Sequence, residues 1–460
     1  MMMAQEAAQV LHAEWNGKDA LFTGVSTDSR TLRQGSLFIA LTGENFDGSR
    51  FVGSAVEKGA VAIMINQVAD NHDLPVNIPL LRVNDTRLGL GQLAAYWRSR
   101  FILPIVGVTG SNGKTTVKEM IAAILRQVAV HDAFKENGVF DQVLATEGNL
   151  NNDIGVPQML LRLRQHHRYA VIEMGMNHIG EISYLTQLAK PTVALITNAG
   201  AAHIEGLGSV EAVARAKAEV FEGMDQQGVA VINADDAYAP LWRECAGSRQ
   251  IMDFGLRERA RINAKYQMHS LMSRIQLKLP DGITEVKLQV PGVHNIYNAL
   301  AAAAAAAALG IKKELIATGL ENFQGVQGRM QKKSGLHHAR LIDDTYNANP
   351  ESVRAALAVL AATEGKRILV LGDMGELGTA AIDLHRTIGR DARKAGLDQL
   401  LTLGELSAYA AEEFGKGAQH FNTLDELLNV AEHLLADDVT LLIKGSRFMQ
   451  MERVVRQLEA

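Results

Sequence analysis

A glycine-rich segment at residues 107–116 has the composition of a phosphate-binding loop. It reads Gly-Val-Thr-Gly-Ser-Asn-Gly-Lys-Thr-Thr, follows a β-rich run and precedes a helical pattern. Glycines let backbone N–H groups approach phosphate oxygens, and the N-terminus of the following helix adds positive potential. Lys114 can then reach the outer phosphates, and the Thr115 hydroxyl can ligate Mg²⁺. The segment predicts a site for a nucleoside triphosphate.

The loop is a shortened form of the strict phosphate-loop pattern. That pattern has a glycine five positions before Gly113, where this chain has Val108. A chance glycine-rich turn is the alternative interpretation. The flanking strand and helix favour the phosphate loop, which we assign to residues 109–116, namely Thr109, Gly110, Ser111, Asn112, Gly113, Lys114, Thr115 and Thr116.

Two potential metal ligands follow later strands. Glu173 ends the apolar run 169–173, and His203 comes shortly after the run 193–197. Ligands of open α/β sheets bind at the carboxyl ends of strands, and a neutral imidazole can bind a divalent metal. A solvated carboxylate and a surface histidine are the alternatives. Their positions make both residues candidate metal ligands and leave these alternatives open.

Lys217 lies in the apolar stripe of the helix predicted over 209–224. Its neighbours at helical spacing include Val213, Val220 and Phe221. A buried ammonium is costly unless it is paired, neutralised or chemically modified. Snorkelling to the helix edge is the alternative. The pattern singles out Lys217 as a functional candidate.

Composition narrows the class of protein. The 460 residues carry 46 basic and 51 acidic side chains, a net charge of −5, so nucleic acid is not an expected partner. One cysteine, Cys245, excludes an internal disulfide or a zinc cluster and fits a reducing cytosol. We expect a cytoplasmic protein, because no signal peptide and no membrane-spanning run stand out.

Short apolar runs alternate with helical patterns almost throughout, which predicts parallel α/β architecture. The segmentation predicts three domains, at 1–102, 103–327 and 328–460. We expect strands at 36–41, 60–65, 105–109, 169–173, 193–197, 229–233, 341–343, 367–371, 400–403 and 440–443, a hairpin at 268–290, and helices at 86–100, 294–309 and 311–322. The polar segment 131–148 is expected to be a surface connection, and 325–328 a linker.

The chain resembles the Mur ligases of bacterial peptidoglycan synthesis over nearly its whole length. The motifs that carry the resemblance are 109–116, 147–157, 294–298, Gly328-Arg329 and 343–350. It implies a central P-loop-type, mostly parallel sheet domain flanked by an N-terminal α/β domain and a C-terminal Rossmann-like domain. The motifs 147–157, 343–350 and 371–378 are closest to the branch that adds D-alanyl-D-alanine to UDP-N-acetylmuramoyl-tripeptide.

The resemblance implies ATP and two Mg²⁺ ions as cofactors, and assigns roles by position. Thr115, Glu173, His203 and a carbamylated Lys217 would hold the metal ions, with Lys114, Glu173, His203 and Lys217 as the catalytic set. Asn295, Asn298, Arg329 and Asp344 would join the loop in binding the nucleotide. The expected substrate-binding residues are Ser26, Asp28, Ser29, Arg30, Asn45, Phe46, Asp47 and Gly48 for the uridine diphosphate end, with Asn149, Asn151, Asn152, Tyr346, Asn347, Asn349, Asp373, Met374 and Lys444 toward the peptides.

The expected reaction is amide formation through an acyl phosphate, by a monomer whose third domain rotates onto the second when ATP binds. Alternatives within enzymes are a sibling ligase that adds another amino acid and a folylpolyglutamate-type ligase. A P-loop switch or motor would hydrolyse nucleotide without any amine. A nucleotide-dependent binding module is the remaining alternative.

Overall fold

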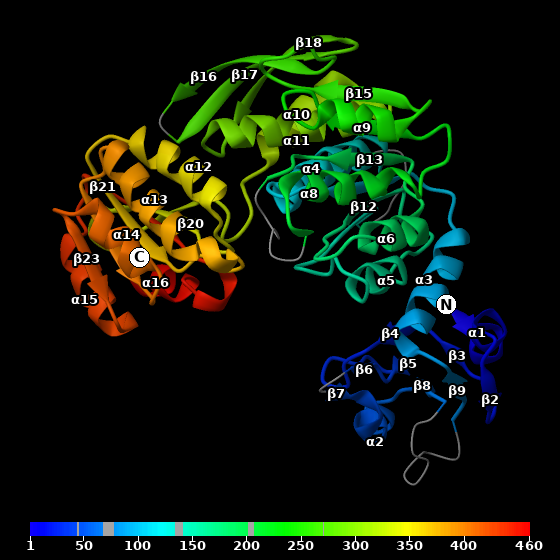
Figure 1. Ribbon diagram of the computed structural model, residues 1–460. Helices are drawn as coiled ribbons and strands as arrows, with labels where there is room; N and C mark the ends of the chain where they lie inside the picture. The colour runs from blue at the N-terminus through cyan, green and yellow to red at the C-terminus, as the bar shows by residue number, and fades with distance from the viewer. Residues whose placement is uncertain (44–45, 68–77, 134–140, 201–206, 270) are drawn as a thin grey trace.

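The computed structural model describes residues 1–43, 46–67, 78–133, 141–200, 207–269 and 271–460. Three α/β domains follow one another along the chain (Figure 1). Among the described residues, no helix combines the length and the apolar character that crossing a membrane requires.

The N-terminal domain is built on a five-stranded sheet of order β2-β9-β8-β5-β4, parallel except for β2. Its elements are β1 (Met2–Met3), α1 (Ala4–Leu11), β2 (Glu14–Asn16), β3 (Leu21–Phe22), β4 (Gly24–Ser26), β5 (Ser36–Ile39), β6 (Thr42–Gly43), β7 (Phe46–Asp47), α2 (Val52–Glu57), β8 (Ala62–Asn66), β9 (Leu80–Val83) and α3 (Thr86–Ser99). Asp85 caps α3 by accepting the backbone N–H groups of Arg87 and Leu88. The predicted strands at 36–41 and 60–65 and the helix at 86–100 correspond to β5, β8 and α3.

The middle domain has a six-stranded, wholly parallel sheet of order β11-β12-β10-β13-β14-β15. Its elements are β10 (Ile105–Thr109), α4 (Lys114–Ala133), β11 (Val143–Ala145), α5 (Gly155–Leu160), β12 (Tyr169–Glu173), α6 (Glu181–Ala189), β13 (Val193–Ile196), α8 (Val210–Ala218), β14 (Val229–Asn233), α9 (Ala239–Ala246), β15 (Gln250–Phe254), α10 (Val293–Ala308) and α11 (Lys313–Asn322). A separate antiparallel sheet holds β16 (Asn263–His269), β17 (Met272–Leu279) and β18 (Gly282–Leu288). Leu300 and the alanines at 299 and 301–306 are buried, and the small alanines let α10 pack closely against α4 and the sheet.

The C-terminal domain has a six-stranded sheet of order β19-β20-β24-β21-β22-β23, in which only β19 is antiparallel to its neighbour. Its elements are β19 (Gln331–Ser334), β20 (Arg340–Asp344), α12 (Pro350–Ala361), β21 (Lys366–Gly372), α13 (Ala381–Lys394), β22 (Gln399–Leu403), α14 (Ser407–Phe414), β23 (Ala418–Phe421), α15 (Leu424–Leu434), β24 (Val439–Lys444) and α16 (Glu452–Leu458). Helices cover both faces, so each face has a hydrophobic cluster of its own.

Two predictions need correction. Segment 131–148 is not only a surface connection, because α4 runs to Ala133 and β11 adds an edge strand with Val143 and Leu144 buried. The hairpin predicted at 268–290 is part of a three-stranded sheet, because β16 pairs with β17 along its whole length. Both missed strands are short or strongly polar, so their pattern was weak.

Candidate functional site

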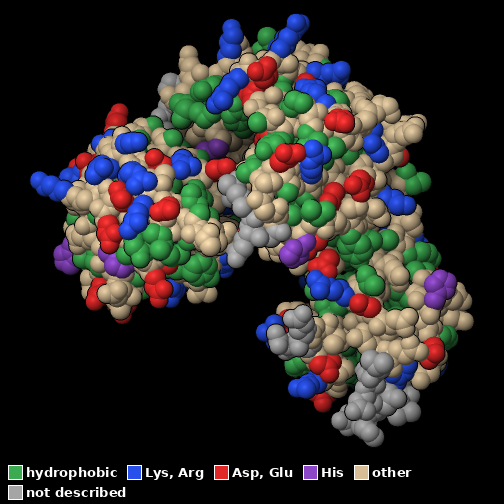
Figure 2. All heavy atoms as spheres, in the orientation of Figure 1, with side chains coloured by type: hydrophobic (Ala, Val, Ile, Leu, Met, Phe, Trp, Pro, Cys, Tyr) green, Lys and Arg blue, Asp and Glu red, His purple; other side chains and the backbone are tan. Residues whose placement is uncertain are grey.

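A cleft of about 1070 Å³ lies between the middle and C-terminal domains. The carboxyl ends of β10, β12 and β13 supply one wall, and those of β20, β24 and β21 supply residues of the other. Two parallel sheets therefore turn their ligand-binding edges toward the same space. Figure 2 shows the two domains close together at the cleft, with open space between the N-terminal and C-terminal domains.

The predicted phosphate loop joins β10 to α4 and lines the cleft. Gly113 has φ +84°, and a Cβ there would collide with the Asn298 side chain, so glycine is required for two reasons. The Lys114 ammonium folds back and donates to the Gly110 carbonyl oxygen at 2.8 Å. This contact holds Lys114 at the centre of the loop.

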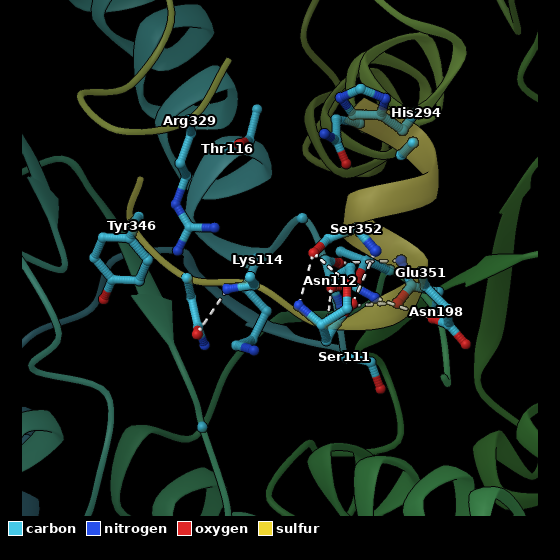
Figure 3. A pocket seen from close by; sticks show the side chains of 18 of the residues that line it. Ser111, Asn112, Lys114, Thr116, Asn198, His294, Arg329, Tyr346, Glu351 and Ser352 are labelled. Carbon is cyan, nitrogen blue, oxygen red and sulfur yellow. Dashed lines mark hydrogen bonds between the residues drawn. The ribbon is translucent and has the colours of Figure 1, made fainter. Parts of the chain in front are cut away.

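Charges from three elements converge on Lys114. Burial lowers the pKa of Lys114, the nearby Glu173 carboxylate raises it, and the Arg329 guanidinium lowers it. Arg329 comes from the C-terminal domain, and its Nη2 donates to the Thr115 hydroxyl at 3.0 Å. Positive charge from both domains therefore meets at the phosphate loop (Figure 3).

Glu173 ends β12 and is buried, with an exposed fraction of 2%. Its Oε1 accepts from Asn151 Nδ2 at 2.9 Å. Its Oε2 is buried and has no hydrogen-bond partner among the described residues. An unpaired buried carboxylate oxygen facing a phosphate loop fits a cation ligand.

Lys217 is buried in α8 as the apolar stripe predicts, with an exposed fraction of 2%. No described residue gives its ammonium a hydrogen bond or an ion pair. Burial lowers the pKa of Lys217 strongly, and the positive charge of Lys114 lowers it further. A buried, unpaired amine close to the phosphate loop is the chemical situation that the sequence pattern indicated.

Two predicted site residues lie outside the part of the chain that the structure describes. These are His203 and Asn45, and the Phe46 side chain is not described either. The described residues alone bring no three His, Cys, Asp or Glu side chains together as a metal cluster. The magnesium role of His203 stays a prediction.

The nucleotide residues predicted from the motifs line the cleft beside the loop. Asn298 donates to Asn295 Oδ1 at 2.9 Å, and Asn295 donates to the Pro291 carbonyl oxygen at 2.7 Å. Across the cleft, the Lys444 ammonium pairs with Asp344 Oδ2 at 2.5 Å. Both pairs are buried and fixed by these contacts.

His294 lies at the start of α10 and lines the same cleft. Burial lowers the pKa of His294 to about 4, with smaller opposing effects of the charges of Asp344 and Lys444. A neutral imidazole is therefore present at neutral pH.

The predicted peptide-binding residues divide between the two walls. Asn149, Asn151 and Asn152 belong to the loop after β11, and Tyr346, Asn347 and Asn349 follow β20; all six line the cleft. Tyr346 joins the walls, because its hydroxyl donates to Asn149 Oδ1 at 3.3 Å and its ring lies 4.1 Å from the Arg329 guanidinium carbon.

Asp373 and Met374 are placed differently from the prediction. The Asp373 carboxylate accepts the backbone N–H groups of Leu406 and Ser407, and Met374 is fully buried in a core cluster. Neither residue lines the cleft, where the following residues 375–377 do. Strand-end position alone could not separate a side chain that braces the next loop from one that faces the ligand.

The N-terminal residues predicted to bind uridine diphosphate lie in two turns of their own domain. Asp28 pairs with Arg30, and Asp47 caps the turn at Ser49. Among the described residues of this set none lines the cleft. Their role stays a prediction.

Several residues that shape the site were not singled out from the sequence. Asn198 holds the phosphate loop, because its backbone carbonyl accepts from Ser111 N and its side chain accepts from Asn112 N. Glu351, Arg447 and Phe448 line the C-terminal wall. Asn198 follows a strand end, a signal that could have found it; Glu351 is the second residue of a helix and gives no such signal.

Comparisons with known proteins identify the family. Residues 21–98, 108–306 and 328–447 match the models described as "Mur ligase family, catalytic domain", "Mur ligase middle domain" and "Mur ligase, glutamate ligase domain". The chain is 41% identical over 458 residues to the UDP-N-acetylmuramoyl-tripeptide–D-alanyl-D-alanine ligase of Escherichia coli K12, covering 99% of this chain and 97% of that one.

Solved structures agree over the whole length. A crystal structure of MurF from Acinetobacter baumannii superposes with a TM-score of 0.88 at 38% identity, covering 99% of this chain and 98% of the other. A MurF ligase from Thermotoga maritima in complex with ADP superposes with a TM-score of 0.81 at 26% identity, covering 96% and 98%. With the three domains and their shared cleft, these matches establish that the chain belongs to the Mur ligase family.

Proposed function

We propose that this chain joins D-alanyl-D-alanine to the terminal carboxylate of UDP-N-acetylmuramoyl-tripeptide, with cleavage of ATP to ADP and phosphate, in peptidoglycan precursor synthesis. The observation that carries the proposal is the match over nearly the whole chain to the Escherichia coli ligase of that name. The cleft adds support, because it combines a phosphate loop with cations from a second domain and asparagines suited to a peptide.

The first step activates a carboxylate, which is a poor electrophile at neutral pH. An oxygen of the tripeptide carboxylate attacks the γ-phosphorus of ATP, the bond to the β-phosphate oxygen breaks, and an acyl phosphate and ADP result. Catalysis of such a step is mainly positioning and charge stabilisation. We assign Lys114, the loop N–H groups and Arg329 to the oxygens on which charge collects.

The second step forms the amide. The free amine of D-alanyl-D-alanine attacks the acyl carbon, and a tetrahedral intermediate collapses with loss of inorganic phosphate and one proton. Closure of the C-terminal wall over the cleft would keep water from the acyl phosphate. No side chain has to act as a nucleophile in either step.

The family implies two Mg²⁺ ions, and the residues present fit one ligand site. Glu173 Oε2 is a buried oxygen with no partner among the described residues, and the Thr115 hydroxyl lies at the start of α4 beside Lys114. We assign Thr115 and Glu173 as ligands, with His203 as a further one. Bound magnesium would neutralise phosphate charge.

Lys217 is assigned as a carbamylated lysine. Addition of CO₂ to the neutral amine gives a carbamate with loss of one proton, and so turns a buried cation into an anion that can bind a metal ion. The burial of Lys217 without a partner among the described residues supports this assignment, because an unmodified ammonium there would be destabilising.

A cytoplasmic location is part of the proposal, because ATP and nucleotide-linked precursors are cytoplasmic compounds. A monomeric state is likewise part of the proposal.

Phosphate release in the presence of a panel of amines tests the function. With UDP-N-acetylmuramoyl-tripeptide and ATP, release should depend on D-alanyl-D-alanine and remain at background with D-alanine, diaminopimelate, lysine or glutamate. Release with no amine at all would favour a switch or motor, and release with another amino acid a sibling ligase.

A further inference from the structure

The helix α12 begins at the cleft with a fixed side-chain cap. Asn349 Oδ1 accepts the backbone N–H of Ser352 at 2.8 Å, and the Ser352 hydroxyl contacts the Asn349 backbone in return. The cap assigns the Asn349 oxygen to the helix, so its amide nitrogen must face outward. That nitrogen donates to Asn112 Oδ1 in the phosphate loop at 2.9 Å.

Asn112 is bonded at each of its backbone and side-chain polar atoms. Its side-chain nitrogen donates to Glu351 Oε2 at 3.2 Å, while its oxygen accepts from Asn349. Its backbone N–H donates to Asn198 Oδ1, and its carbonyl accepts from Thr197 Oγ1 at 2.7 Å and Asn198 Nδ2 at 3.0 Å. The residue thus ties the phosphate loop to the middle sheet and to the first turn of α12 (Figure 3).

Gly200 supplies a second, independent observation. A Cβ at this position would collide with the Glu351 carboxylate, so only glycine lets Glu351 lie against the chain after β13. The Gly200 backbone N–H also donates to the Ser111 hydroxyl at 2.9 Å. The Glu351 carboxylate therefore lies directly against Gly200 of the middle domain as well as against Asn112.

We propose that Glu351 is a positioning residue for the ligase reaction: with Asn112 and Asn349 it forms a clasp that holds the C-terminal domain in register with the phosphate loop. In Figure 3 Asn112 lies between Lys114 and Glu351, so the Glu351 carboxylate contacts the loop on the side away from the lysine. The clasp keeps Arg329 and Lys444 over the cleft without touching the reacting atoms. This inference rests on the proposed function, since its kinetic test uses that reaction.

Loss of the clasp has a defined kinetic signature. If it stabilises the docked arrangement, its removal lowers the fraction of molecules that can bind both substrates. The apparent KM then rises by the inverse of that fraction, while saturating substrates restore docking and leave kcat nearly unchanged. A residue that touched the reacting atoms would lower kcat instead.

The test compares Glu351→Ala and Gly200→Ala with Arg354→Ala, a control on the outward side of α12 that pairs with Asp391. We expect KM for D-alanyl-D-alanine to rise about tenfold in the first two variants, with kcat within about twofold, as the loss of the hydrogen bond between Asn112 and the charged Glu351 carboxylate predicts. The control should match the wild type.

A distance measurement needs no catalysis. Cys245 is the chain's one cysteine and is exposed on α9, so a spin label there and one at Lys416→Cys report the separation of the middle and C-terminal domains. Without ligands, Glu351→Ala and Gly200→Ala should broaden the distance distribution. Unchanged KM and an unchanged distribution in both variants would overturn the clasp; a wild-type enzyme inactive with D-alanyl-D-alanine would instead overturn the proposed function.

Discussion

The two outer domains are attached to the middle domain in different ways. Buried residues of the N-terminal and middle domains belong to one hydrophobic cluster, in which α3 packs on α5 and α6. The C-terminal domain has clusters of its own, and its contacts with the phosphate loop are polar. Its apolar contact with the β16–β17 hairpin is made through Leu271.

This difference indicates that the N-terminal domain is attached rigidly to the middle domain and that the C-terminal domain can move. A shared core breaks only at the cost of exposing apolar area, whereas polar contacts can exchange with water or ligand. The N-terminal joint is therefore suited to holding a substrate end at a fixed distance. The C-terminal joint is suited to opening and closing over the cleft.

The largest effect is expected near the phosphate loop of the middle domain, where the charge of Lys114 acts on Lys217. Lys217→Ala should reduce activity at least about 10³-fold, because it removes an anionic metal ligand. Added short carboxylic acids should restore part of it. Arg215→Ala, on the exposed side of α8, is the control and should stay active; full activity of Lys217→Ala would refute the carbamate.

Disrupting the hydrophobic cluster that the N-terminal and middle domains share should affect folding instead. Trp97 is 8% exposed, lies in the shared cluster, and its Nε1 donates to the Leu163 carbonyl oxygen at 3.0 Å. Trp97→Ala should lower the free energy of unfolding by about 3–5 kcal/mol, measured by urea denaturation. Trp97→Phe, which keeps much of the apolar volume, should lose clearly less; equal losses would argue against a shared core.

Arg329→Ala should lower activity and leave stability nearly unchanged, the opposite of what we expect for Trp97→Ala. The side chain donates to the Thr115 hydroxyl of the phosphate loop and lies over the Tyr346 ring of its own domain, and we assign it to the phosphates. Activity should fall about 10²-fold, the effect of losing one electrostatic contact. The free energy of unfolding should change by less than about 1 kcal/mol. A large loss of stability with a normal kcat would mean that this polar contact serves folding rather than catalysis, which would contradict the contrast between the two outer domains.

Movement can be compared by small-angle scattering. Saturation with an ATP analogue should reduce the radius of gyration, because the C-terminal domain rotates onto the middle one about the linker at 325–328. Labels placed in the N-terminal and middle domains should keep their separation. An unchanged radius of gyration would count against closure.

The smallest expected effect is on the pH dependence of stability, through His294 in the cleft between the middle and C-terminal domains. The pKa of His294 is about 4 in the folded chain, below its ordinary value near 6.5. The unfolded chain therefore binds the proton first, so stability is full above pH 6.5 and is lost as the pH falls toward 4. Between pH 7 and 5.5 the loss should be about 1 kcal/mol, and His294→Gln should have a shallower slope in thermal unfolding.

The sequence predicted the elements with a strong apolar pattern. The central strands β10, β12, β13 and β14 are found within one residue of their predicted ends. Edge strands such as β11, β15, β19 and β23 were missed, because they are short or partly exposed and carry no clear period. Lys217 was found because burial of a charged residue on an apolar stripe is visible in the helical period.

The rest of the site depends on contacts between residues far apart in the sequence. Glu351 reaches the phosphate loop across 239 positions, and no local pattern marks it. Asp373 has the strand-end position of a ligand-binding residue, yet its carboxylate caps the loop after β22. Local spacing indicates which chemistry is present, whereas the docking of two domains decides which side chains meet.

Product analysis tests the central claim most directly. Incubation with UDP-N-acetylmuramoyl-tripeptide, ATP and D-alanyl-D-alanine should give, by mass spectrometry, one new species heavier than the tripeptide by the dipeptide less one water, with one ADP formed for each. ADP formation with the tripeptide mass unchanged, or a product carrying a different amine, would contradict the assignment of this chain as the D-alanyl-D-alanine ligase.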